Sequence, residues 1–264
     1  MEWLGYILSV IIGVILGLIG GGGSILAIPI LVYLFHIEPV MASAYSLFIV
    51  GMTSLIGAIP KYRDHLVNLR TGLVFGIPSI ISIFITRKWI VPAIPDTIAM
   101  IGEFNFSKRL LLLVLFALLM ITAAVTMIRG GTRFTHDDHR NRTYILIAEG
   151  TLIGFLTGLV GAGGGFLIIP ALVLLTGLPF KTAVGTSLFI IAANSLVGFI
   201  GDVLNYPIEW RFLLEITVLA VAGIFVGNLA NDYVSPVKLR RIFGWFVLAT
   251  GIAIIVRELS VAGL

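Results

Sequence analysis

Two glycine runs are the features of this chain whose residue types and spacing most clearly suggest a binding site. The stretch "GLIGGGGSILAIP" at 17–29 contains four consecutive glycines followed by a serine: Gly20, Gly21, Gly22, Gly23 and Ser24. The stretch "GLVGAGGGFLIIP" at 158–170 contains Gly161, Gly163, Gly164 and Gly165. Successive glycines weaken a helix and favour an unwound segment. An unwound segment that leads into a short helix presents unpaired amides and a positive dipole end, which together predict a small-anion site. The alternative is a flexible kink that only permits tight helix packing.

Neutral hydrogen-bonding side chains recur after each glycine run. Spacings of seven to nine residues return them to one helix face, where they can donate hydrogen bonds to an oxyanion. Serine and threonine also bond to carbonyls of their own helix, and asparagine joins neighbouring helices, so a packing role stays open. The predicted substrate-binding side chains are Tyr45, Ser46, Thr53 and Ser54 after the first run and Thr186, Ser187, Asn194 and Ser195 after the second.

Charged side chains within the apolar segments are predicted only at Glu149 and Glu215, near the starts of their segments. Glu149 either carries a coupling proton or lies at the membrane interface. No lysine or arginine is expected deep in any segment, so backbone amides and neutral side chains are expected to hold the anion. Lys61, Arg63 and Arg70 either attract anions to a cytoplasmic mouth or act as topology anchors.

Several other functions are excluded by composition and motif. The chain has no cysteine, which removes thiol chemistry and cysteine metal ligands. The adjacent ligands of "HDDH" at 136–139 indicate a solvated loop, so no metal and no cofactor is expected. Neither glycine run is a phosphate-binding or dinucleotide motif. No catalytic constellation is evident, so no enzyme is predicted.

Composition points to a membrane. Hydrophobic residues make up 59% of the chain and charged residues 11%, too few to cover the surface of a soluble protein of 264 residues. Uncharged runs at 110–128, 182–201 and 216–231 approach the length that spans a bilayer. The net charge of +4 resides in short loops between apolar segments, which argues against a nucleic-acid partner. We expect a multi-pass plasma-membrane protein whose first apolar segment is retained.

The chain contains an internal duplication. A shift of 141 residues aligns 17–57 with 158–198 at 19 identities in 41 positions without a gap. The halves are a first repeat at 1–128, a linker at 129–142 and a second repeat at 143–264. The second segment of each repeat is too short to span a bilayer, which predicts helices broken at the glycines. The predicted segments are 3–20, 24–35, 42–59, 71–86 and 109–128, then 143–160, 166–176, 182–200, 212–230 and 239–256.

The predicted fold is therefore an all-α polytopic membrane protein with two homologous five-segment repeats and glycine-broken helices near the bilayer midplane. If every segment crosses, the repeats are inverted, and the loops near 61–70, 129–142, 181 and 236–241 share a side with 11 of the 17 Lys and Arg residues. That side is cytoplasmic. If the short segments re-enter, the repeats are parallel and the basic residues divide almost evenly. We favour inversion.

Small residues at four-residue intervals mark a packing face in each repeat. Ser9, Gly13 and Gly17 align with Gly150, Gly154 and Gly158. Such a stripe lets a second helix backbone approach closely. Helix packing is therefore the expected role of these residues, in contrast to the consecutive glycines.

The paired "GLxGxGG…P" runs, each followed by an "SLF" helix with a polar pair at 53–54 or 194–195, resemble the TauE/SafE sulfite exporter family. The resemblance implies a secondary transporter of sulfite or small organosulfonate-like anions, expected to export them. The alternatives are an uptake transporter or a channel for such anions, or a non-transporting membrane scaffold. The expected partners are a small sulfur-containing anion, the lipid bilayer and a coupling proton or Na⁺. The substrate, coupling ion and oligomeric state stay open.

Overall fold

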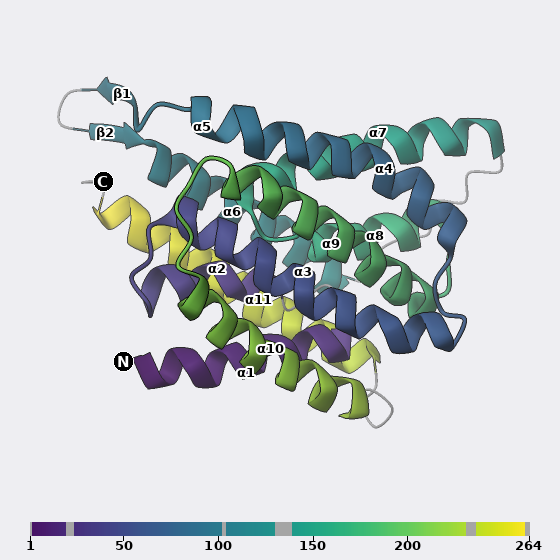
Figure 1. Ribbon diagram of the computed structural model, residues 1–264. Helices are drawn as coiled ribbons and strands as arrows, with labels where there is room; N and C mark the ends of the chain where they lie inside the picture. The colour runs from purple at the N-terminus through teal and green to yellow at the C-terminus, as the bar shows by residue number, and fades with distance from the viewer. Residues whose placement is uncertain (1, 20–23, 102–103, 130–138, 231–235, 262–264) are drawn as a thin grey trace.

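The protein is a bundle of helices in the computed structural model, which describes residues 2–19, 24–101, 104–129, 139–230 and 236–261 (Figure 1). Every apolar segment predicted from the sequence forms a helix. These helices are α1 (Glu2–Ile19), α2 (Ser24–Tyr33), α3 (Pro39–Arg63), α4 (Leu69–Ile85), α6 (Lys108–Arg129), α7 (His139–Val160), α8 (Gly165–Thr176), α9 (Phe180–Val203), α10 (Trp210–Ala230) and α11 (Pro236–Val261).

Two features were not predicted from the sequence. The helix that begins as α4 continues beyond Ile85 through a π-helical turn, η1 (Thr86–Ile90), into the short α5 (Val91–Ala93). An antiparallel hairpin of β1 (Thr97–Ile101) and β2 (Phe104–Ser107) then leads to α6. The hairpin was missed because its strands are short and lie between two long apolar segments.

Six of the described helices are long and apolar enough to cross a membrane: α3, α4 with η1 and α5, α6, α7, α9 and α10. Helices α2 and α8 are much shorter, at 10 and 12 residues, and confirm the predicted short second segments. At a rise of 1.5 Å per residue, each reaches across only about half of a ~30 Å hydrocarbon core. The chain is thus an all-α polytopic membrane protein.

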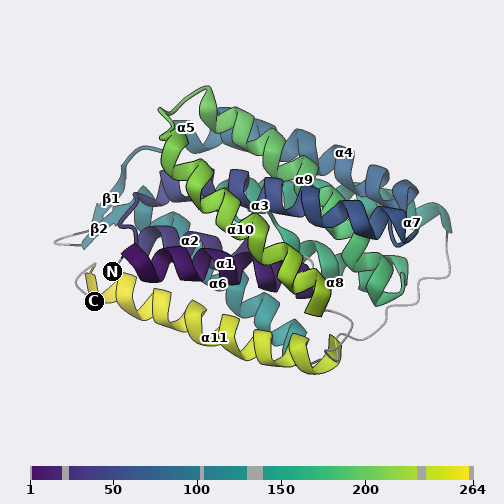
Figure 2. The same cartoon turned by 60° about the horizontal axis from the view of Figure 1, so that its bottom comes forward.

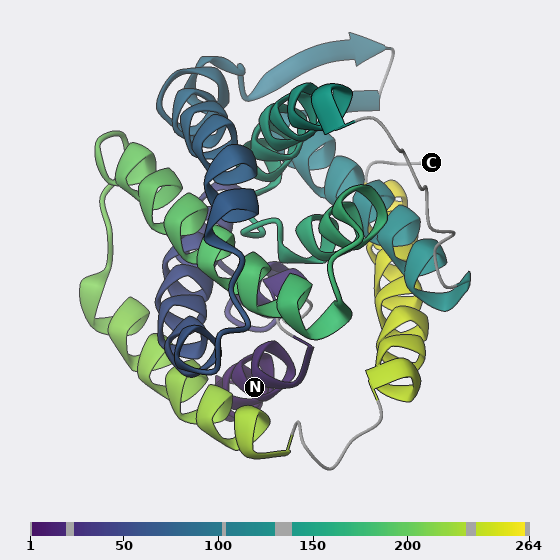
Figure 3. The same ribbon diagram turned by 90° about the vertical axis from the view of Figure 1, so that its right-hand side faces the viewer.

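Helices α3 and α9 pack against each other and are the most buried of the membrane-length helices. Three further pairs surround them: α1 with α10, α4 with α7, and α6 with α11. Figure 3 looks along the bundle and shows these pairs arranged around the centre. Polar residues on α3 and α9 are therefore held away from lipid.

The small-residue stripes pack helices as predicted. A Cβ at Gly13 would overlap the backbone of Ala220 in α10, and a Cβ at Gly154 would overlap the backbone of Ser79 in α4. These contacts correspond under the 141-residue shift, since Gly13 aligns with Gly154 and Ser79 aligns with Ala220. The pairs α1–α10 and α4–α7 thus pack through equivalent positions.

The helix directions follow the pattern expected of inverted halves. Helix α1 begins at the end of the bundle that carries the hairpin, whereas α7 begins at the opposite end (Figures 1 and 2). Helices α4, α9 and α11 also begin at that opposite end. The repeat itself stays an interpretation of the sequence, and the assignment of the opposite end to the cytoplasm stays a prediction.

Candidate functional site

The second glycine run forms an irregular segment between α7 and α8. Gly161, Gly163 and Gly164 have φ angles of +80°, +66° and +73°, in the left-handed region that favours glycine. The Gly161 amide donates to the Thr157 carbonyl at 2.7 Å, and α8 begins at Gly165. At the start of α8 the amides of Leu167 and Ile168 donate to the Gly164 carbonyl at 2.9 and 3.0 Å, so the candidate anion donors are the amides of Gly165 and Phe166. That these amides bind an anion stays a prediction.

Helices α3 and α9 bring polar side chains to this glycine segment. A Cβ at Gly163 would lie 2.8 Å from Ser195 Oγ of α9 and 2.8 Å from a methyl carbon of Val50 in α3. A Cβ at Gly161 would overlap Ser43 of α3. The absence of side chains at Gly161 and Gly163 is therefore what lets polar groups of the central helices reach this backbone.

Four of the predicted polar residues have unused hydrogen-bonding capacity. They are completely inaccessible to solvent, and buried polar atoms are usually hydrogen-bonded. Asn194 donates to Ser79 Oγ at 2.6 Å, which leaves its own carbonyl oxygen free. The atoms that make no hydrogen bond within the described part of the chain are Ser46 Oγ, Ser54 Oγ, Ser195 Oγ and Asn194 Oδ1.

Four other predicted side chains have hydrogen-bond partners within the described part of the chain. Thr53 donates to the Ile49 carbonyl at 2.6 Å, and Ser187 donates to the Val184 carbonyl at 2.8 Å, so both bond within their own helices. Two more accept bonds from loop backbones: Tyr45 from the Glu209 amide at 3.0 Å and Thr186 from the Asn68 amide at 2.9 Å.

The first glycine run is less completely described. Gly20, Gly21, Gly22 and Gly23 lie outside the described residues, and Ser24 is buried at the start of α2. Any anion-binding role for this run stays a prediction.

The structure corrects the expectation that no arginine or lysine lies within a span. Arg87 lies in η1, inside the apolar helix that runs from Leu69 to Ala93, and its side chain is 0% exposed. Its Nη1 atom lies 2.9 Å from Ser43 Oγ and 3.4 Å from Asp202 Oδ1 of α9, another fully buried charge. The sequence had placed acidic residues in the spans only at Glu149 and Glu215, so Asp202 is a second correction.

Arg87 also contacts the glycine segment. A Cβ at Gly161 would overlap Arg87 Nη2, so the guanidinium lies directly against the Gly161 backbone. Neither Nε nor Nη2 of Arg87, nor Oδ2 of Asp202, makes a hydrogen bond to a described residue. An ionisable residue within a membrane span is by default a functional-site hypothesis.

The loop after α9 secures the π-helical turn that carries Arg87. Asn205 donates to the carbonyls of Lys88 at 3.2 Å and Gly201 at 3.0 Å, which joins η1 to the end of α9. Burial, and secondarily the Asp202 carboxylate, raise the pKa of the nearby Tyr206 hydroxyl above its usual range. Tyr206 is therefore a neutral phenol in the physiological range.

The remaining predicted charges lie away from this cluster or at the surface. Glu149 is half-buried in α7. Glu215 forms an exposed ion pair with Arg211 at 3.1 Å. Arg63 and Arg70 are exposed at the ends of α3 and α4, as either of their predicted roles requires.

No cluster of potential metal ligands occurs among the described residues. Of the "HDDH" stretch, 136–138 lie outside the described residues, and His139 is the first residue of α7. The expectation that this stretch binds no metal stays a prediction.

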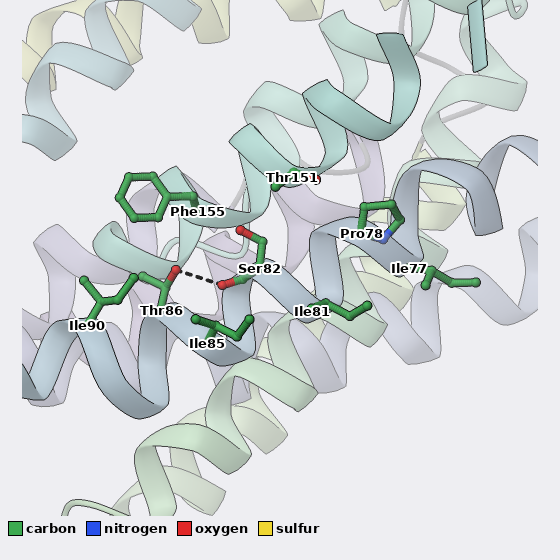
Figure 4. A pocket seen from close by; sticks show the side chains of 9 residues that line it. All are labelled: Ile77, Pro78, Ile81, Ser82, Ile85, Thr86, Ile90, Thr151 and Phe155. Atoms are coloured by element: carbon green, nitrogen blue, oxygen red, sulfur yellow. Dashed lines mark hydrogen bonds between the residues drawn. The ribbon is translucent and has the colours of Figure 1, made fainter. Parts of the chain in front are cut away.

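An apolar groove of about 350 Å³ lies along α4 and α7 (Figure 4). Its walls include Ile77, Ile81 and Ile85, which are exposed on the outside of the bundle. Thr86 also lines it, with its hydroxyl donated to the Ser82 carbonyl at 2.8 Å. None of the predicted site residues lines this groove, and its composition suits lipid chains better than an anion.

A polytopic helical bundle with a buried polar cluster beside a helix break is the architecture of a membrane transporter. Comparison with known proteins agrees. Residues 6–254 match the family described as Sulfite exporter TauE/SafE, and the chain belongs to this family.

Relatives across bacteria and archaea carry names that say no more than membrane transport. A "Probable membrane transporter protein" of Xylella fastidiosa (strain Temecula1) is 30% identical over 94% of this chain and 92% of its own length. "Probable membrane transporter protein YunE" of Bacillus subtilis is 27% identical over 86% of this chain and 89% of its own. "Probable membrane transporter protein MJ0441" of Methanocaldococcus jannaschii is 27% identical over 88% of this chain and 89% of its own. No solved structure matches the chain significantly.

Proposed function

We propose that this membrane transporter is a secondary transporter that exports sulfite or a small organosulfonate-like anion across the plasma membrane. The observation that carries the proposal is the position of Ser195. Its hydroxyl is fully buried, makes no hydrogen bond to a described residue and lies beside Gly163 at the break between α7 and α8.

The chemistry of this position suits a sulfur oxyanion. Sulfite and sulfonates present three oxygens that accept hydrogen bonds, and the start of α8 and the Ser195 hydroxyl supply donors. Binding between the two most buried helices also explains how an anion avoids contact with lipid. The family description supports the substrate class and the direction of transport, because it names sulfite export.

The inverted repeat forms part of the proposal. Two halves of opposite orientation would place equivalent glycine breaks on either side of one site, and rocking of one half against the other would expose it alternately. Equivalent packing of α1 on α10 and of α4 on α7 supports this arrangement. Inward and outward states would then have similar free energies, so the gradient of a coupling proton or Na⁺ would set the direction.

The direct test is flux of ³⁵S-sulfite through reconstituted proteoliposomes, kept anaerobic to prevent oxidation. We expect counterflow above that of protein-free liposomes. Flux equal to the background for sulfite, sulfoacetate and taurine alike would refute the proposal and favour the scaffold alternative. Repeating the assay with imposed pH and Na⁺ gradients separates a coupled exporter, whose flux responds to one of them, from a channel, whose flux responds to neither when the membrane potential is clamped.

A further inference from the structure

The ion pair of Arg87 and Asp202 lacks the geometry of a stabilising salt bridge. Both side chains are 0% exposed, yet they meet through a single contact of 3.4 Å. Arginine and carboxylate groups that stabilise one another usually form two parallel hydrogen bonds at about 2.7–2.9 Å. Desolvating two charges is costly, and it is offset only when the remaining donors and acceptors are also satisfied. Here Nε and Nη2 of Arg87 and Oδ2 of Asp202 are not satisfied by any described residue.

The two unsatisfied nitrogens of Arg87 lie on one edge of the guanidinium. Nε and Nη2 point their hydrogens in the same direction and together form the fork that binds two oxygens of one anion. The opposite corner, Nη1, is held by Ser43 and Asp202. Since a Cβ at Gly161 would overlap Nη2, the free edge lies against the glycine segment.

The backbone around Arg87 is also irregular. Arg87 lies in a π-helical turn, and such turns are rare and frequently occur at functional sites. The turn is backed by α9: a Cβ at Gly201 would lie 3.0 Å from Arg87 Cβ, and Asn205 binds the Lys88 carbonyl. Arg87 is therefore held firmly at its backbone while one edge of its side chain has no partner among the described residues.

From this geometry we propose that Arg87 is the charged ligand of the transported oxyanion, and that Asp202 is the internal carboxylate that the anion displaces. The inference rests on the proposed function, which it extends by assigning the charge that binds the substrate. In the state described here Asp202 partly neutralises Arg87. When the anion enters, two of its oxygens take the Nε and Nη2 edge beside Gly161, and the 3.4 Å contact with Asp202 is given up.

The second half of the chain lacks an equivalent cation. The 141-residue shift aligns Arg87 with Asn228 of α10, whose Oδ1 is also buried without a partner among the described residues. Asn228 lies against Gly17, since a Cβ there would be 2.7 Å from the Asn228 amide. Among the arginines whose side chains the structure describes, Arg87 alone is buried, so we infer one strong anion site and not one in each half.

The test measures sulfite binding to four purified full-length proteins by thermal unfolding in detergent: wild type, Asp202→Asn, the double variant Arg87→Gln/Asp202→Asn, and the control Arg109→Gln. The double variant removes both charges together, so it leaves no unpaired buried charge to unfold the protein. The control breaks a different ion pair, Arg109 with Glu258 at 3.4 Å between α6 and α11.

We expect sulfite to raise the melting temperature of wild type and Arg109→Gln at the same half-saturating concentration. Asp202→Asn should bind sulfite more tightly, because the competing carboxylate is gone. The double variant should fold but require at least about tenfold more sulfite, because a charge-assisted bidentate contact is lost. Counterflow of ³⁵S-sulfite should fall with it.

Two results would overturn the inference. One is a folded double variant that binds sulfite as wild type does, which would make the pair structural. The other is a folded Asp202→Asn protein that binds sulfite no more tightly than wild type does. That result would show that the Asp202 carboxylate does not compete with the anion for Arg87. If wild type itself neither binds nor moves sulfite, the proposed function fails, and this inference fails with it.

Discussion

Replacing Ser195 with alanine distinguishes a residue that binds substrate from one that holds the fold together. Ser195 Oγ makes no hydrogen bond to a described residue, so its removal breaks no described hydrogen bond. A buried polar group without a partner costs about 1–3 kcal/mol, so the alanine variant should melt at the same temperature as wild type or higher. If the hydroxyl donates to the anion instead, the variant loses a hydrogen bond to a charged group. That bond contributes about 1.5–3 kcal/mol, which corresponds to a roughly 10- to 150-fold weaker affinity.

The assay is a paired measurement of melting temperature in detergent and half-saturating sulfite concentration in counterflow. The matched control is Ser9→Ala, the same substitution at an equally buried serine whose hydroxyl donates to the Gly5 carbonyl at 2.8 Å in α1. The control should keep wild-type affinity and lose a little stability. A Ser195→Ala protein that melts lower and binds sulfite as wild type does would refute the reasoning, because Ser195 would then be a structural residue.

Three further predictions follow from particular positions. Gly161→Ala should abolish counterflow, because its Cβ would overlap Arg87 and Ser43. The control Gly177→Ala introduces similar backbone strain, at φ +64°, and should keep counterflow. Equal flux in both variants would contradict this prediction. Gly154→Val should prevent a monodisperse chromatographic peak, because α7 could no longer approach the α4 backbone, and a well-folded variant would refute that packing. The chain contains no cysteine, so single cysteines can report its orientation. A membrane-impermeant maleimide should label Thr97→Cys from outside the cell and Arg63→Cys only after lysis. Labelling of both variants from outside would exclude the predicted orientation.

The helices were largely predictable because membrane segments are marked by long uncharged runs. Ten predicted segments correspond to helices, and the segments at 24–35 and 166–176 are short helices of 10 and 12 residues, as predicted. One predicted segment, 71–86, ends before its helix does, because the charged residues Arg87 and Lys88 follow the apolar run. The helix continues to Ala93 because Arg87 is buried against α9, a contact 115 residues away in the chain.

The neutral residues of the candidate site could be named from the sequence, whereas Arg87 and Asp202 could not. Their roles in binding stay predictions. The two glycine runs and the serines at the aligned positions 54 and 195 form a pattern that the 141-residue shift reveals. Arg87 and Asp202 each stand near the end of an apolar run, where charged residues usually mark the interface. The 141-residue shift does not indicate this pair either, because Arg87 aligns with Asn228 and Asp202 aligns with Lys61. Only the packing of η1 on α9 brings the two charges together beside Gly161.

The central claim is that an oxyanion binds where α8 begins, against the Gly161–Gly164 backbone. A cryo-electron microscopy structure of the protein at saturating sulfite tests it most directly. We expect anion density within hydrogen-bond distance of Ser195 Oγ and of the Nε and Nη2 edge of Arg87, with the first amides of α8 directed at it. Sulfite bound elsewhere, with the Arg87–Asp202 contact intact and Ser195 turned away from the ligand, would contradict the account.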